Sequence, residues 1–129
     1  MTTYNGLGEL INSRMAVRYL CFEKVLSATD ITYTLEIPNT AAYLPENNDA
    51  GMVVWDQGDR LWNLRMTVRV DQRKAFKQKE WLPLARKNEA QVGESVKFYF
   101  TRTPNGDSNY YVEFQGRNRI PVLQLLPHN

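Results

Sequence analysis

The sequence predicts a mainly β protein in which about seven short strands and two short helices form a closed or nearly closed barrel. Several segments alternate apolar and polar residues, which is the pattern of a strand with one buried face. The chain of 129 residues is 43% hydrophobic, enough for one domain with its own core. We expect a leader over residues 1–18, one domain over residues 19–126 and a tail over residues 127–129.

The leader has no clear strand pattern. Leu10, Ile11 and Met15 have the spacing of one face of a helix, so we expect an amphipathic helical turn there. No apolar stretch flanked by positive charge marks a signal peptide, and no apolar run approaches the roughly 20 residues that span a membrane. The sequence thus predicts no membrane partner.

The domain is expected to open with two strands separated by a polar loop. Residues 19–26 alternate weakly and form the first strand. Residues 27–34 are polar and loop-like, with Asp30 as a turn or capping residue. Residues 35–37 form a short strand that ends at Pro38, because proline has no N–H to donate to a neighbouring strand.

A short helix is predicted next, over residues 41–44. Asn39 or Thr40 can cap its start, and Pro45 closes it. Residues 46–50 are acidic and rich in Asn, which is typical of a loop.

The central hairpin is the clearest element of the sequence. Residues 51–55 form one strand, residues 56–59 turn, and residues 60–70 return as a long strand. On the long strand we expect the buried face to consist of Trp62, Leu64, Met66, Val68 and Val70. The opposite face carries Asn63, Arg65, Thr67, Arg69 and Asp71. A loop over residues 71–74 and a short strand over residues 75–78 follow.

The last third combines one helix with a second hairpin. Residues 80–88 have helical spacing, and proline is tolerated in a first turn. Strands are predicted at residues 96–101 and 110–115 around an Asn105-Gly106 turn, since Asn-Gly suits a type I′ turn. Residues 120–126 are expected to add a final strand.

Charge is distributed in blocks along the chain. Residues 30–59 carry six acids and no Lys or Arg, whereas residues 60–79 carry seven Lys or Arg and one acid. If the fold keeps the two blocks apart, the surface is polarised; otherwise both are ordinary solvated faces.

The sequence contains no constellation that predicts an enzyme. His128, the only histidine, stands next to the C-terminal residue, and Cys21 is the only cysteine. One His and one Cys cannot assemble a structural zinc site, and a terminal tail rarely holds the positioned imidazole that a His-based triad needs. No phosphate-binding or dinucleotide-binding glycine motif occurs, so we expect no catalytic residue, no metal and no cofactor. Asp56 and Asp59 flank a turn, and turn chemistry explains them better than catalysis.

Five phrases of the sequence resemble the plant B3 DNA-binding domain, in the order in which that family has them. They span about residues 22–114 and lie at residues 22–30 (FEKVLSATD), 35–45 (LEIPNTAAYLP), 56–65 (DQGDRLWNLR), 79–81 (KEW) and 92–98 (VGESVKF). Each phrase is weak alone, but five in register are specific. The resemblance implies a seven-stranded open pseudobarrel with two short α-helices, which grips double-stranded DNA by two arms in the major groove.

The resemblance places the N-arm at about residues 27–34 and the C-arm at about residues 63–74. It implies DNA contacts near the N-arm from Lys24, Ser27, Thr29, Thr32 and Tyr33. On the C-arm it implies contacts from Asn63, Arg65, Arg69, Gln72, Arg73 and Lys74. Arg65, Arg73 and Asn63 are the expected base readers, and Lys24, Arg69 and Lys74 the expected phosphate contacts.

The implied function is sequence-specific DNA binding by a plant regulator of transcription in the nucleus. Two other functions stay open: a B3-fold module for protein or chromatin association with weak non-specific DNA affinity, and the recognition module of a restriction-type nuclease. A protein partner or a homodimer also stays open. Individual residues have simpler interpretations too, because Arg65 can pair with Asp56 or Asp59, and Arg69 with Asp71.

Overall fold

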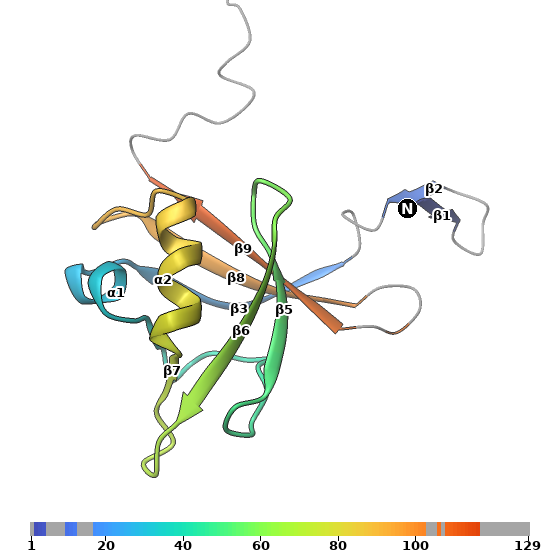
Figure 1. The fold of residues 1–129 in the computed structure, drawn as a ribbon. Helices are drawn as coiled ribbons and strands as arrows, with labels where there is room; N and C mark the ends of the chain where they lie inside the picture. The colour runs from blue at the N-terminus through green and yellow to red at the C-terminus, as the bar shows by residue number, and fades with distance from the viewer. Residues whose placement is uncertain (1, 5–9, 13–16, 103–105, 107, 117–129) are drawn as a thin grey trace, which may run out of the picture.

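The structure is a computed structural model that describes residues 2–4, 10–12, 17–102, 106 and 108–116 (Figure 1). In this part of the chain it contains nine strands and two α-helices. The strands are β1 Thr2–Tyr4, β2 Leu10–Asn12, β3 Arg18–Val25, β4 Glu36–Ile37, β5 Gly51–Trp55, β6 Leu61–Val68, β7 Lys74–Phe76, β8 Ser95–Arg102 and β9 Ser108–Gln115. The helices are α1 Ala28–Thr32 and α2 Gln78–Lys87.

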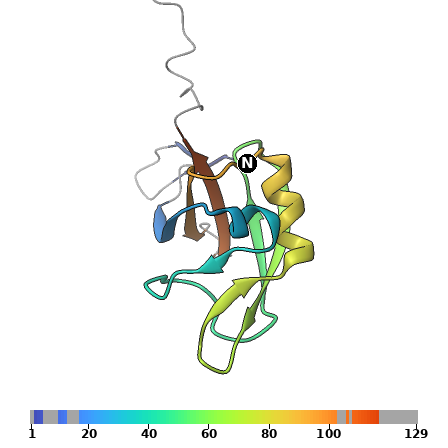
Figure 2. The ribbon, with the colours of Figure 1, turned by 90° about the vertical axis from the view of Figure 1, so that its left-hand side faces the viewer.

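Seven strands form one curved sheet in the order β3-β8-β9-β5-β6-β7-β4. All neighbours are antiparallel except β5 and β9, which pair in parallel through Val54–Tyr110 and Trp55–Tyr111. The sheet curls around a central core, with α1 and α2 on the same side of the molecule (Figures 1 and 2). The predicted seven-stranded pseudobarrel with two short helices is therefore confirmed.

The core consists of the inward residues of these strands and of one face of α2. Trp81 of α2 is fully buried and stacks on Phe76, with ring centroids 5.5 Å apart. Phe98 of β8 lies 5.1 Å from Phe76, and Phe114 of β9 lies 6.1 Å from Trp81. This aromatic column fixes the start of α2 against β7, which positions the surface described below.

The first helix lies at α1, inside the segment expected to be a loop, and not at residues 41–44. Ser27 caps α1, because its hydroxyl accepts from the backbone N–H of Asp30 while the Asp30 carboxylate accepts from the backbone N–H of Ser27. Tyr43 has a φ of 64°, which is incompatible with an α-helix. Residues 41–44 instead form a bend, anchored where the N–H of Ala42 donates to the carbonyl of Cys21.

The long strand is shorter than predicted. It ends at Val68, and a tight turn follows. In this turn the backbone N–H of Arg69 donates to the Arg73 carbonyl, and Gln72 has a φ of 70°. Val70, expected on the buried face, is fully exposed in this turn. The next strand is β7, and α2 already begins at Gln78.

The ends of the chain differ from expectation where they are described. Leu10 and Ile11 lie in β2, which pairs with β1, and not in a helical turn. Met15, Asn105 and the strand expected at residues 120–126 lie outside the described residues. The hairpin of β8 and β9 is confirmed, and Gly106 in its connection has a φ of 85°.

Candidate nucleic-acid interface

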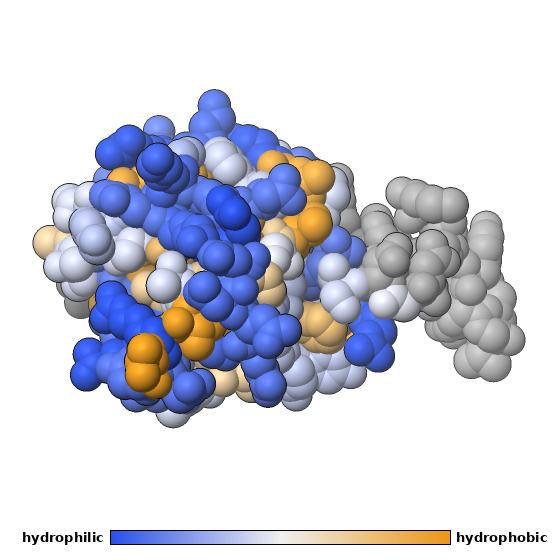
Figure 3. Space-filling view, turned by 60° about the horizontal axis from the view of Figure 1, so that its bottom comes forward, coloured by the Kyte–Doolittle hydropathy of each residue, from blue (hydrophilic) through white to orange (hydrophobic). Residues whose placement is uncertain are grey.

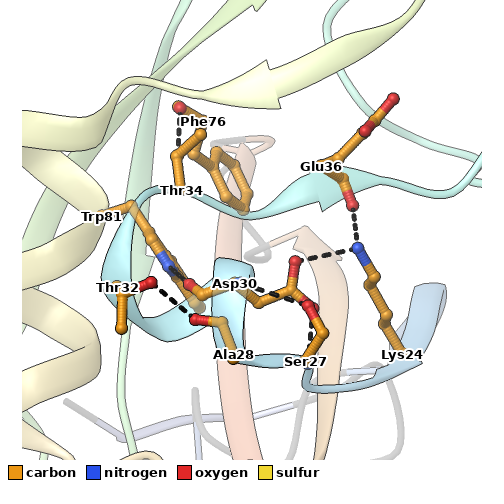
Figure 4. Close-up of polar contacts among 9 residues, drawn as sticks. All are labelled: Lys24, Ser27, Ala28, Asp30, Thr32, Thr34, Glu36, Phe76 and Trp81. Carbon is orange, nitrogen blue, oxygen red and sulfur yellow. Dashed lines mark hydrogen bonds and ion pairs between the residues drawn. The ribbon is translucent and has the colours of Figure 1, made fainter.

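The base of the N-arm is held by a partly buried polar cluster (Figure 4). The Lys24 ammonium donates to Asp30 Oδ1 and to the Glu36 carbonyl, both at 2.9 Å. The indole N–H of Trp81 donates to the Asp30 carbonyl at 2.7 Å. Lys24 and Ser27, both predicted DNA contacts, therefore support α1 in the free protein.

Hydroxyl groups further along the N-arm are also used internally. Thr32 donates to the Ala28 carbonyl at 2.8 Å, and Thr34 donates to the Phe76 carbonyl. Among the described residues, no partner is found for the side chains of Thr29 and Tyr33. Tyr33 is 58% exposed, so it is the N-arm aromatic that a ligand can reach.

On the C-arm, Arg65 is held by α2. Its backbone N–H donates to Glu80 Oε1 at 2.8 Å, and its Nε and Nη2 lie 2.9 Å from Glu80 Oε2. The alternative partners considered from the sequence, Asp56 and Asp59, are not the ones used.

Asp56 instead organises the turn between β5 and β6. It is fully buried and accepts from the Arg60 backbone and guanidinium, the Gly58 backbone, the Trp62 indole and the Asn88 amide. Burial alone would raise the pKa of the Asp56 carboxyl, but these hydrogen bonds together lower that pKa to about 2. The expected turn role of Asp56 is the one that the structure has.

The basic and acidic blocks meet in space. Lys77 pairs with Asp49 at 2.6 Å, and this hydrogen bond lowers the pKa of the Asp49 carboxyl. Arg73 lies 4.0 Å from Glu36 and 3.2 Å from Asp71. The fold thus pairs part of each block with the other, so the surface is less polarised than the charge pattern predicts.

Other C-arm side chains are less constrained. The Lys74 ammonium donates to the Pro45 carbonyl at 3.2 Å. No side-chain partner is found for Asn63, Arg69 or Gln72 among the residues that the structure describes, and the pairing considered for Arg69 with Asp71 is not formed.

Two hollows border the hairpin of β6 and β7. The first, which we call the cationic groove, has a volume of about 440 Å³. It is lined by Tyr33, Thr34, Arg65, Thr67, Arg69 and residues 75–80. The second, the outer hollow, has a volume of about 730 Å³ and is lined by Ile37, Pro38, Asn39, Ala41, Glu46 and residues 71–74.

The two hollows differ in charge. The cationic groove has four cations, Arg65, Arg69, Lys77 and Lys79, and one carboxylate, Glu80. The outer hollow has two cations and two carboxylates. The end of the molecule that carries the β6–β7 turn is covered mainly by hydrophilic residues, with small separate hydrophobic spots (Figure 3). An anionic ligand is therefore favoured in the cationic groove.

The groove brings together only part of the predicted site. Tyr33 of the N-arm and Arg65 and Arg69 of the C-arm line it, whereas Gln72, Arg73 and Lys74 line the outer hollow. Lys77, Gln78 and Lys79 were not predicted. Their signal was present, because residues 60–79 form the basic block and Lys79 belongs to a B3-like phrase.

Within the described residues, a reactive thiol or a metal-binding cluster would indicate other chemistry. Burial raises the pKa of the Cys21 thiol to about 12, so this thiol stays protonated. In the same part of the chain, no three His, Cys, Asp or Glu residues are grouped to hold a metal ion. Neither helix there is long and apolar enough to cross a membrane.

No family model and no curated protein matches the chain. Solved structures do. The hypothetical Arabidopsis thaliana protein At1g16640.1 superposes with a TM-score of 0.61 at 23% identity, covering 81% of this chain and 97% of that one. FUS3 of Arabidopsis, in a complex with DNA, superposes with a TM-score of 0.59 at 17% identity, covering 76% of this chain and 98% of that one.

These likenesses show the fold. Both neighbours are B3-type structures, and the chain is a B3-type pseudobarrel, as the phrases of its sequence implied.

Proposed function

We propose that this protein binds double-stranded DNA in a sequence-dependent manner, with the N-arm and the C-arm in the major groove. The cationic groove carries the proposal, because it joins exposed Tyr33 of the N-arm to Arg65 and Arg69 of the C-arm. The B3-type fold of a neighbour that is solved in a complex with DNA supports it. Transcriptional regulation in a plant nucleus is the biological role that we propose with it.

The binding has an electrostatic component and a base-reading component. Arg69, Lys77 and Lys79 supply positive charge along the groove, and each phosphate that they neutralise releases a condensed counterion. Arg65 is the proposed base reader in the groove, because a guanidinium can donate two parallel hydrogen bonds to guanine O6 and N7.

The remaining predicted contacts divide into two groups. Lys24, Ser27 and Thr32 form hydrogen bonds within the N-arm. We therefore propose that they affect DNA binding by holding the N-arm in its conformation. Arg73 is 57% exposed and pairs with exposed Asp71. Such exposed pairs contribute at most about 1 kcal/mol, so DNA can replace the carboxylate. Arg73, Gln72, Lys74, Asn63 and Thr29 stay proposed contacts outside the cationic groove.

The test is selection from randomised duplexes at two salt concentrations. Wild type should enrich one motif, and Arg65→Ala and Arg73→Ala should each lose preference at particular positions. Lys79→Gln should weaken binding to all duplexes and reduce the slope of log K against log salt by about 0.9, the value for one phosphate contact. Lys87→Gln is the matched control, since it removes the same charge from the other end of α2.

Other outcomes identify the alternatives. Equal binding of every duplex by wild type contradicts sequence specificity and favours the association module. Cleavage of DNA by a longer native form of the protein that includes this chain contradicts a role in binding alone and favours the recognition module of a restriction-type nuclease.

A further inference from the structure

Glu80 contacts Arg65 at both its backbone and its side chain. Glu80 Oε1 accepts the Arg65 backbone N–H at 2.8 Å, while Oε2 lies 2.9 Å from Nε and from Nη2. Glu80 lies in the first turn of α2, where the helix dipole favours a carboxylate. The next residue, Trp81, is fully buried, so the position of Glu80 is anchored in the core.

This contact uses one edge of the guanidinium and leaves another. Nε and one N–H of Nη2 face Glu80, whereas the end of the fork, Nη1 with the second N–H of Nη2, does not take part. Arg65 is 50% exposed, and it lines the cationic groove. The end of the fork is one of the two arginine edges that can donate two parallel hydrogen bonds to guanine.

We propose that Glu80 is a positioning residue, which holds Arg65 with the end of its fork available to a guanine. Specificity at one G·C pair then depends on a carboxylate that does not itself bind DNA. This inference rests on the proposed function, since it needs Arg65 to read a base. An exposed ion pair contributes little to stability, so the main consequence of the contact is the orientation of Arg65 before DNA arrives.

The proposal predicts two effects of opposite sign. Glu80→Gln keeps the size of the side chain but removes its charge, so Arg65 is held less firmly. Preference for guanine should therefore fall. Affinity for non-specific DNA should rise, because a negative charge has been removed from a groove that faces phosphates. A residue that only supported the fold would weaken both kinds of binding together.

Asp49 supplies the matched control. Its carboxylate pairs with Lys77, another cation of the same groove, at 2.6 Å. Asp49→Asn should also raise non-specific affinity, but it should leave the guanine preference unchanged, because Lys77 is not the proposed base reader.

The experiment measures competition between two duplexes. One is the duplex selected by wild type, and in the other a different base replaces the guanine for which Arg65→Ala has lost its preference. Wild type should discriminate by roughly 5- to 150-fold, the range for one bidentate contact. Arg65→Ala should remove this discrimination, and Glu80→Gln should reduce it by at least about threefold on the same scale. The double variant should equal Arg65→Ala, because Glu80 acts through Arg65.

Thermal unfolding and circular dichroism check that each variant is folded. If Glu80→Gln does not fold, Glu80→Asp replaces it: the charge stays, the reach shortens, and discrimination should fall without a rise in non-specific affinity. Unchanged discrimination in the folded Glu80 variant overturns the inference. The inference is also overturned if Arg65→Ala retains some discrimination and adding Glu80→Gln lowers it further. Equal binding of both duplexes by wild type overturns the proposed function itself.

Discussion

Replacing Asp56 tests whether its hydrogen bonds hold the turn of β5 and β6 to the end of α2. Its carboxylate accepts the indole N–H of Trp62 at 2.9 Å and the amide of Asn88 at 3.0 Å. Asn88 is the residue that ends α2, and its backbone N–H donates to Leu84. Asp56→Ala therefore removes an acceptor that a strand and a helix end share.

The magnitude follows from the number of donors. A hydrogen bond lost by a buried or half-buried donor costs about 1–3 kcal/mol. Asp56→Ala removes the acceptor of the half-buried Trp62 indole and one of the two acceptors of the Asn88 amide, which keeps its hydrogen bond to the Leu84 carbonyl. Half-exposed Arg60 can turn to water. We expect a loss of about 2–4 kcal/mol in the free energy of unfolding, which is a large part of the 5–15 kcal/mol typical of a domain. Asp56→Asn should lose nearly as much, because its amide group would face other donors in either orientation.

Urea unfolding, followed by tryptophan fluorescence and far-UV circular dichroism, measures this loss at constant m-value. Glu23→Gln is the control, because it removes an exposed carboxylate that pairs with Lys97 at 3.5 Å and should cost less than about 1 kcal/mol. A loss below about 1 kcal/mol for Asp56→Ala, or an equal loss for both variants, would refute the reasoning.

Four further outcomes are expected. Because the pKa of Asp56 is lowered to about 2 in the folded state, its contribution to the free energy of unfolding is complete above about pH 4 and is lost as the pH falls toward 2. The free energy of unfolding should therefore fall less steeply with decreasing pH in Asp56→Asn than in wild type, and equal slopes would contradict this. Ser27→Ala removes the cap of α1 and should cost about 1 kcal/mol in urea unfolding, whereas no loss would show that the cap is dispensable. Val70→Ser should change stability by less than about 0.5 kcal/mol, since Val70 is fully exposed; a core-sized loss would place it in the interior after all. Cys21 should react with a thiol reagent at pH 8 only as fast as the protein opens, and rapid reaction of the native protein would contradict its burial.

The fold was predictable where one physical signal dominated. Alternation from Trp62 to Met66 correctly assigned the buried face of β6, because period-two burial is the main constraint on a strand in a one-sided sheet. The same alternation failed at Val70, where a tight turn with Gln72 at positive φ ends the strand. Local turn geometry outweighed hydrophobic pattern there.

The first helix was misplaced for a similar reason. Residues 41–44 include good helix formers, but a proline on each side confines this short segment. α1 forms instead because Ser27 and Asp30 satisfy each other's backbone N–H groups. The capping residues, more than the composition of the segment, decided where the helix lies.

The positions of the two arms of the candidate site were predictable, whereas the ion-pair partners of its residues were less so. The basic block indicated the C-arm, and the groove includes Arg65 and Arg69 as expected. The ion pairs of Arg65 with Glu80 and of Lys77 with Asp49 join residues far apart in the sequence, so no local pattern revealed them.

Most residues of the cationic groove come from one continuous segment of the chain. Apart from Tyr33 and Thr34, its lining comes from the continuous run of residues 65–80, a hairpin followed directly by a helix. Other parts of the sheet depend on pairings of β3 with β8 and of β5 with β9, which join distant segments. Short loops close at low entropic cost and long ones form later, so the C-arm side of the groove can assemble early in folding and the N-arm joins it last. Partial unfolding from the β3 edge would accordingly release one arm while the other kept its shape.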